Sequence, residues 1–187
     1  MARIGLKNFL FGNLYEQPDG TPEYGDAVKP GKAVSCSVSI SNNSGSLYAD
    51  DAIAESDTSF QSGTVTLTID DEDLEVMAKL LGHTYNSTDK SILRKTTDVA
   101  PYVGLGRVIT KIIGGTYKYK VEFLYKVKFA EPSQEDNTKG ESIEFGTTQL
   151  EGTIATLASG EWSKGQTFDT EAAAITFLEG MFGDVSE

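Results

Sequence analysis

The chain has 187 residues and a formal net charge of −12, and 39% of its residues are hydrophobic against 24% charged. These values predict one globular domain over 1–187 and disfavour proteins that read DNA or RNA, because a negative field repels phosphate groups. One histidine, His83, and one cysteine, Cys36, exclude an intrachain disulfide and leave Ser-His-Asp, Cys-His and Cys/His zinc sites with few partners.

The first third of the chain predicts strands. In 1–17, asparagine and glycine interrupt the apolar residues, which indicates a first strand rather than a signal peptide, and no apolar run reaches the roughly 18 residues of a membrane span. In 34–40 and 64–69, apolar residues alternate with serine or threonine, the pattern of half-buried strands. Cys36 falls on the apolar face of its strand, which predicts a small core residue.

A first helix is expected over 71–81, after the acidic run Asp70–Asp73 and before Gly82, its expected C-cap. The acidic run lacks the spacing of an EF-hand calcium loop, and a helix N-terminus favours its negative charge. His83 follows the helix and, with no second histidine as co-ligand, predicts a structural or surface role. The expected apolar stripe of the helix is Leu74, Met77, Leu80 and Leu81.

The most informative stretch is 101–129, which contains the two-residue hairpin turn Gly114-Gly115. Counting outward from this turn predicts the opposing residues, with complementary charges and aromatic rings over glycines. Because these glycines lie under aromatic partners and lack a third glycine, the nucleotide-binding interpretation of 104–106 is weak. The expected pairs are Ile113–Thr116, Val108–Val121, Arg107–Glu122, Gly106–Phe123, Leu105–Leu124 and Gly104–Tyr125.

Each arm of this hairpin is expected to have about 12 residues or more, about twice the usual strand length. One face should carry Tyr117, Tyr119, Val121, Phe123, Tyr125 and Val127, and the other Lys111, Lys118, Lys120, Glu122, Lys126 and Lys128. Three interpretations of the lysine stripe remain open: nucleic-acid binding, a solvated or edge-protecting face, and a subunit interface.

Two polar stretches, 42–60 and 130–141, predict long loops. The first holds the acidic residues Asp50, Asp51, Glu55 and Asp57, which on composition alone fit a solvated loop, an interface, or a metal or catalytic site.

The C-terminal part predicts further strands around 142–146 and 148–157, then a helix over 170–182 capped by Asp169 or Thr170. Its expected apolar surface is Ala173, Ile175, Phe177, Leu178 and Met181. The residues therefore predict a mainly β fold with two helices, of the α+β class.

Several segments in this order resemble the major tail proteins, or tail tube proteins, of long-tailed bacteriophages and prophages of Gram-positive bacteria. The segments are GLKNFLFGNLY, SLYADDAIAE, LEVMAKLLGH, APYVGLG, the KFAEPS…SIEF series and QLEGTIATL, which together run from about residue 4 to about residue 157.

The resemblance implies a β-sandwich or barrel of two antiparallel sheets with a long hairpin and a flanking helix, and no C-terminal immunoglobulin-like domain. It implies a structural subunit, not an enzyme, without cofactors or metal, in the non-contractile tail of the virion and made in the host bacterial cytoplasm. Six copies would form a ring, and stacked rings would form the conduit for DNA ejection. The implied partners are other copies of the chain, the tape-measure protein inside the tube, the tail terminator and distal tail proteins, and phage DNA that passes through without sequence-specific binding.

In that context the acidic stretch at 46–60 fits an interface better than a metal or catalytic site, with its aspartates meeting lysines of a neighbouring copy. The predicted inter-subunit residues are Tyr48, Asp50, Asp51, Glu55, Lys118, Lys120, Lys126, Lys128, Glu131, Gln134, Glu135 and Asp136. The alternatives are a tube subunit of a phage-derived contractile injection or bacteriocin particle, a monomeric β-sandwich binding module with Trp162 in an aromatic platform, and a carboxylate-dependent hydrolase.

Overall fold

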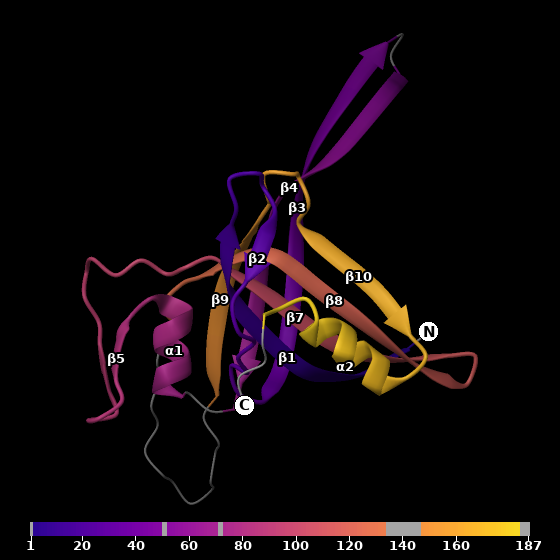
Figure 1. Cartoon of the computed structure of the whole chain (residues 1–187). Helices are drawn as coiled ribbons and strands as arrows, with labels where there is room; N and C mark the ends of the chain where they lie inside the picture. Colours follow the sequence, from indigo (N-terminus) through magenta and orange to yellow (C-terminus); the bar gives the residue numbers. More distant parts are fainter. Residues whose placement is uncertain (1, 50–51, 71–72, 134–146, 184–187) are drawn as a thin grey trace, which may run out of the picture.

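The computed structural model describes residues 2–49, 52–70, 73–133 and 147–183, with the backbone alone at 2–3, 45–49 and 52–57. It is mainly β with two helices and has two antiparallel sheets, one large and one small, as predicted for an α+β β-sandwich (Figure 1).

The large sheet has the strand order β2-β1-β7-β8-β9-β4-β3, and β10 also pairs with β8. The bounds are β1 Ala2–Glu16, β2 Pro22–Tyr24, β3 Ala33–Ala49, β4 Ala52–Ile69, β7 Val103–Ile113, β8 Thr116–Phe129, β9 Thr148–Ala155 and β10 Ser163–Phe168. The small sheet pairs β5 Thr84–Asn86 with β6 Ser91–Leu93. The predicted strands over 1–17, 34–40, 64–69 and 148–157 are therefore confirmed, whereas 142–146 lies outside the described residues.

The large sheet curls, so that β1 and β3 come into contact although they are far apart in the strand order. Its concave side encloses one buried cluster, here called the inner core, to which five of the described strands contribute buried residues. Members of the inner core include Phe11 on β1, Leu67 on β4, Leu105 on β7, Leu124 on β8 and Leu150 on β9, and Cys36 on β3 packs against it as predicted.

The first helix, α1, spans Leu74–Leu81 and covers part of the inner core. It begins later than the predicted residue 71 because Asp73 is its N-cap, with a side chain that accepts a hydrogen bond from the Glu75 N–H at 2.9 Å. Gly82 ends it in the left-handed conformation, with φ of 77°, as predicted. The predicted stripe is wrong at Leu74, which is 37% exposed, since the N-terminal residue of the helix lies beyond the edge of the core. The buried face consists of Met77, Ala78, Leu80 and Leu81.

The second helix, α2, spans Glu171–Glu179 and packs on the convex side of the sheet over β7 and β8 (Figure 1). Thr170 caps it, as one of the two predicted residues, and it ends before Gly180 rather than at 182. Its buried residues are Ala174 and Leu178, with Phe182 beyond the helix end, so the predicted contribution of Ala173 is wrong and that residue is exposed. The sequence does not show which alanine of the run 172–174 is buried. In the structure Ala174 is buried, because it lies one helical turn before Leu178 on the same face.

The β7–β8 hairpin turns at Gly114-Gly115, and its predicted pairs are confirmed from Ile113–Thr116 to Leu105–Leu124. The predicted Gly104–Tyr125 pair is wrong, because a bulge shifts the register and Val103 pairs with Val127.

The same bulge reverses the sides of the last residues of β8, so the predicted faces are wrong beyond Tyr125. Val127 and Phe129 enter the inner core together with Leu124, whereas Tyr119, Val121, Phe123 and Tyr125 belong to the cluster under α2. Lys126 and Lys128 alternate with Val127 and therefore lie on the opposite face of β8 from Lys118 and Lys120. The single lysine stripe does not exist.

The segment 42–60 is not the predicted loop. It continues the β3–β4 ladder, with Asn42 opposite Phe60 and Ala49 opposite Ala52, and the hairpin projects from the body (Figure 1). Residues 41–44 and 58–59 are exposed, so this part of the hairpin lacks the inward-facing apolar residues whose alternation reveals a strand in a sequence.

Candidate assembly interface

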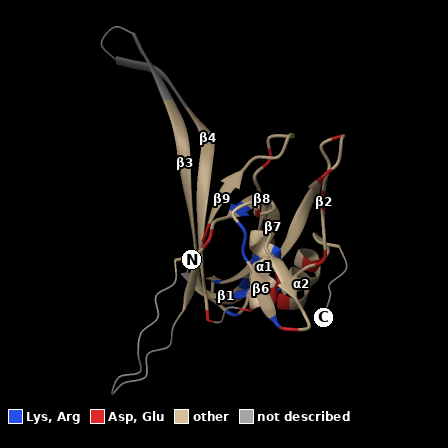
Figure 2. Ribbon diagram, turned by 90° about the vertical axis from the view of Figure 1, so that its left-hand side faces the viewer, with Lys and Arg blue, Asp and Glu red and all other residues tan. Residues whose placement is uncertain are grey.

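The outer edge of β3 has no strand partner among the described residues. Within the described ranges, β3 pairs only with β4, although it has 17 residues. Neither 33–44 nor 58–69 contains a charged residue or a proline, and in Figure 2 the ribbon of these residues is neither blue nor red. Edge strands of soluble proteins are commonly protected by lysine, proline or short length, and β3 has none of these protections.

Two of the predicted interface residues belong to the far part of this hairpin. Tyr48 lies on β3 and Glu55 on β4, where the backbone alone is described. Asp50 and Asp51 lie outside the described residues, as do Gln134, Glu135 and Asp136 of the second predicted loop.

The predicted lysines of β8 have partners within their own chain. Lys118 pairs with Asp169, Lys120 with Glu122 at 3.0 Å, and Lys126 with Glu16 at 2.6 Å. Lys126 and Lys128 also lie over the Tyr102 ring, at 4.7 and 5.3 Å from its centroid. Because β8 is flanked by β7 on one side and by β9 and β10 on the other, the edge-protecting interpretation of these lysines is wrong.

Glu131, another of the predicted inter-subunit residues, contacts His83 of the same chain.

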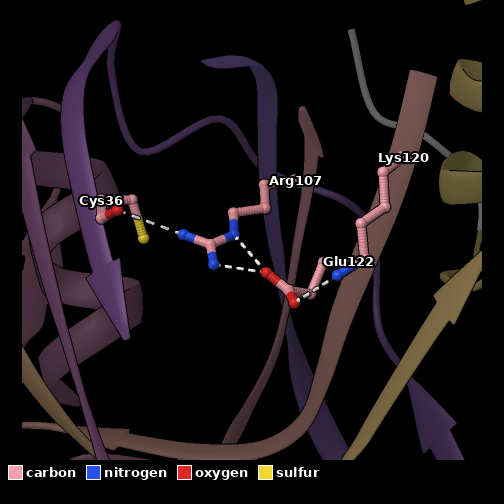
Figure 3. Close-up of polar contacts among 4 residues, drawn as sticks. All are labelled: Cys36, Arg107, Lys120 and Glu122. Atoms are coloured by element: carbon pink, nitrogen blue, oxygen red, sulfur yellow. Dashed lines mark hydrogen bonds and ion pairs between the residues drawn. The ribbon is translucent and has the colours of Figure 1, made fainter. Parts of the chain in front are cut away.

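A buried polar network crosses the concave side of the sheet from β7 to β3 (Figure 3). Arg107 is 8% exposed and donates from Nε to Glu122 Oε2 at 3.0 Å, with a second bond from Nη2 to the same oxygen. Its Nη1 donates to the backbone carbonyl of Cys36 at 3.3 Å. Lys120 Nζ donates to the second oxygen of Glu122 at 3.0 Å. Arg107 therefore connects the central β7–β8 ladder with the edge strand β3.

The electrostatic surroundings keep Glu122 ionised. Burial opposes the charged carboxylate, but the hydrogen bonds and charges of Arg107 and Lys120 outweigh it and lower the pKa of Glu122. Burial raises the pKa of the Cys36 thiol, which the charge of Arg107 only partly offsets, so this thiol is not an activated nucleophile.

The structure does not support two other binding sites considered from the sequence, a nucleotide site at 104–106 and an aromatic platform at Trp162. Gly104 and Gly106 lie within β7, close to its first residue, and not in a strand-turn-helix context. Trp162 is half-buried against the inner core and stacks on Phe60 with 4.8 Å between ring centroids, so it does not present the free ring that a glycan-binding platform needs.

No family model matches this chain, and no curated protein compared with it matches. None of the helices in the described residues is long and apolar enough to cross a membrane. The same residues contain no group of three or more histidine, cysteine or acidic side chains arranged to hold a metal ion.

Sequence reasoning paired Arg107 with Glu122 but missed the carbonyl of Cys36, because the two residues are 71 positions apart. It also missed the open edge of β3. The absence of charge over 33–44 was visible in the sequence, but only the sheet order shows that this strand is an edge.

Proposed function

We propose that the protein is a self-assembling structural subunit of a phage tail tube, in which copies form stacked rings around a channel for DNA. The observation that carries the proposal is the long, uncharged and unpaired edge of β3 in a hairpin that leaves the body.

An isolated two-stranded hairpin is marginally stable in water, and an open edge without charge is a template for another strand. A second copy that supplies a strand would satisfy both needs. A ring needs heterologous contacts, in which one surface of a subunit meets a different surface of the next, and stacked rings can then extend without closing. The edge of β3 and the far part of the hairpin are two separate surfaces, which can serve contacts within a ring and contacts between stacked rings.

Charge supports a role as a conduit. With a net charge of −12, the surface does not retain DNA phosphates. The lysines of β8 do not oppose this argument, because Lys118, Lys120 and Lys126 each have a carboxylate partner in the same chain.

Negative-stain electron microscopy of the purified chain, at high concentration and over a series of salt and crowding conditions, tests the proposal. We expect rings or tubes with a central hole, more of them as salt screens the repulsion between acidic subunits. Monomers or disordered aggregates under all these conditions would contradict the proposal.

A shortened hairpin provides the matched variant. Replacing 45–57 with Asn-Gly joins Ser44 to Thr58, which already face each other, through a favoured two-residue turn. We expect this variant to melt within a few degrees of the wild type, because the backbone of 45–49 and 52–57 projects from the body that holds the inner core (Figure 1). We also expect it to form no tubes. Tubes as abundant as those of the wild type would show that assembly does not need residues 45–57.

Charge reversal at Asp50 and Asp51 tests the predicted acidic contact separately. The double variant D50K/D51K is expected to weaken assembly severalfold, measured by light scattering, and to leave the circular dichroism of the monomer unchanged. The variant D19K/D89K changes the net charge equally at exposed positions elsewhere in the chain and serves as the control. Equal assembly of the two variants would show that net charge alone matters.

A further inference from the structure

The single histidine lies between two carboxylates. His83 follows the C-cap of α1, and its side chain is 5% exposed. Its Nδ1 is 2.9 Å from Asp98 Oδ2, in the segment between β6 and β7. Its Nε2 contacts Oε1 of Glu131, two residues beyond the end of β8. Three separate segments of the chain therefore meet at one imidazole ring.

Both contacts can be hydrogen bonds only if the group holds two protons. A neutral imidazole has one N–H and one lone pair, and an ionised carboxylate only accepts. With two ionised carboxylates and a neutral ring, one of the two contacts would place a lone pair against a carboxylate oxygen. The observed geometry therefore fits an imidazolium that donates from both nitrogens, and losing one proton breaks one contact.

We propose that His83, Asp98 and Glu131 form a pH-sensitive clasp, which holds the segment after β8 against the end of α1 and releases Glu131 when the group loses its second proton. The inference does not depend on the proposed function, since it concerns contacts within one chain.

The contact that breaks on deprotonation is the one with Glu131. Asp98 is held from two further sides, because its backbone N–H donates to the carbonyl of Lys95 and its carboxylate accepts the Lys95 N–H at 2.8 Å. The Glu131 side chain is 54% exposed, so water can replace the histidine as its partner. The deprotonated ring therefore keeps Nδ1–H on Asp98 and leaves Nε2 without a donor proton.

The direction of the pH effect follows from the proton count. The closed clasp holds one proton more than a neutral ring with two ionised carboxylates, so the stability that it contributes falls as pH rises. At the acid end, the hydrogen bond from His83 and the Lys95 N–H lower the pKa of Asp98, and the charge of Lys95 acts in the same direction. The contribution of Asp98 is present above the ordinary aspartate pKa and is lost as pH falls through its lowered value. The clasp is thus closed in mildly acidic solution and opens toward alkaline pH.

Urea unfolding at about pH 5.5 and pH 8 tests the clasp in the full chain, kept at a concentration where it is monomeric. For the wild type we expect the folding equilibrium constant to be about threefold to tenfold smaller at the higher pH. E131Q should lose this difference, because a glutamine amide accepts from N–H in one orientation and donates to a lone pair in the other. E179Q removes the same charge from α2 and should retain the wild-type pH dependence.

Nuclear magnetic resonance of the ring nitrogens gives the second readout, and the chain has only one histidine to assign. We expect both nitrogens to carry protons at about pH 5.5 and, toward pH 8, the loss of the Nε2 proton with Nδ1–H retained. A pH dependence of unfolding in E131Q as large as that of the wild type would overturn the proposal. So would a ring with a single proton at the lower pH.

Discussion

Replacing Arg107 with alanine is expected to lower the free energy of unfolding by about 3–5 kcal/mol, the largest effect of any single change considered for this fold. The change removes the two bonds to Glu122 and the bond to the Cys36 carbonyl, and it leaves a partly buried carboxylate with Lys120 as its remaining cation. Urea unfolding of the monomer measures the loss. Because Arg107 helps to lower the pKa of Glu122, the wild type loses the stability that ionised Glu122 contributes as pH falls through this lowered pKa. The variant lacks part of that contribution at neutral pH, so we expect its further loss on acidification to be smaller.

Two controls separate the ion pair from general damage to the sheet. D169N breaks the ion pair between Asp169 and Lys118, which lies on β8 like Glu122. Asp169 is 83% exposed, so we expect the free energy of unfolding to fall by less than about 1 kcal/mol. The double variant R107M/E122L replaces both charges with apolar side chains and should recover most of the stability lost in R107A. A loss in R107A no larger than that in D169N would show that the network does not hold β3 to β7.

Replacing Gly104 with alanine is expected to cost about 1–3 kcal/mol through overpacking. A Cβ atom at this position would lie 2.4 Å from Cε1 of Tyr24 and 2.9 Å from Cζ of Phe123. The Tyr24 ring cannot move away freely, because its hydroxyl donates to the Tyr125 carbonyl at 2.9 Å and its edge packs on Phe123. Thermal and urea unfolding both measure this change.

Gly5 provides the matched control for Gly104. It also lies in a strand of the large sheet, but a Cβ there would meet only Thr110, at 3.9 Å, which is ordinary contact. We expect G5A to be within about 0.5 kcal/mol of the wild type. In a Y24A background the cost of G104A should fall, because the two closest atoms that its Cβ strikes belong to Tyr24 and only the contact with Phe123 remains. An unchanged cost in that background would attribute the effect of G104A to the backbone instead.

The local pattern of the chain was sufficient to predict most of the elements and one register. Alternation of apolar and hydroxyl side chains identified β3 and β4 near the core, and Gly114-Gly115 placed Arg107 opposite Glu122. Asp73 and Gly82 mark the limits of α1 through capping, which depends only on neighbouring residues. These features are determined by interactions between residues close in sequence, or by counting from a turn.

The bulge near Gly104, the extent of the projecting hairpin and the partners of the lysines were decided by tertiary structure. The bulge turns Val127 inward and Lys126 outward, and the alternation of residues within 101–129 does not predict this reversal. Arg107 reaches the carbonyl of Cys36, and His83 meets Asp98 and Glu131, only because the curled sheet brings these distant segments together. A sequence specifies the donors and charges that it contains, but which of them become partners depends on packing over the whole sheet.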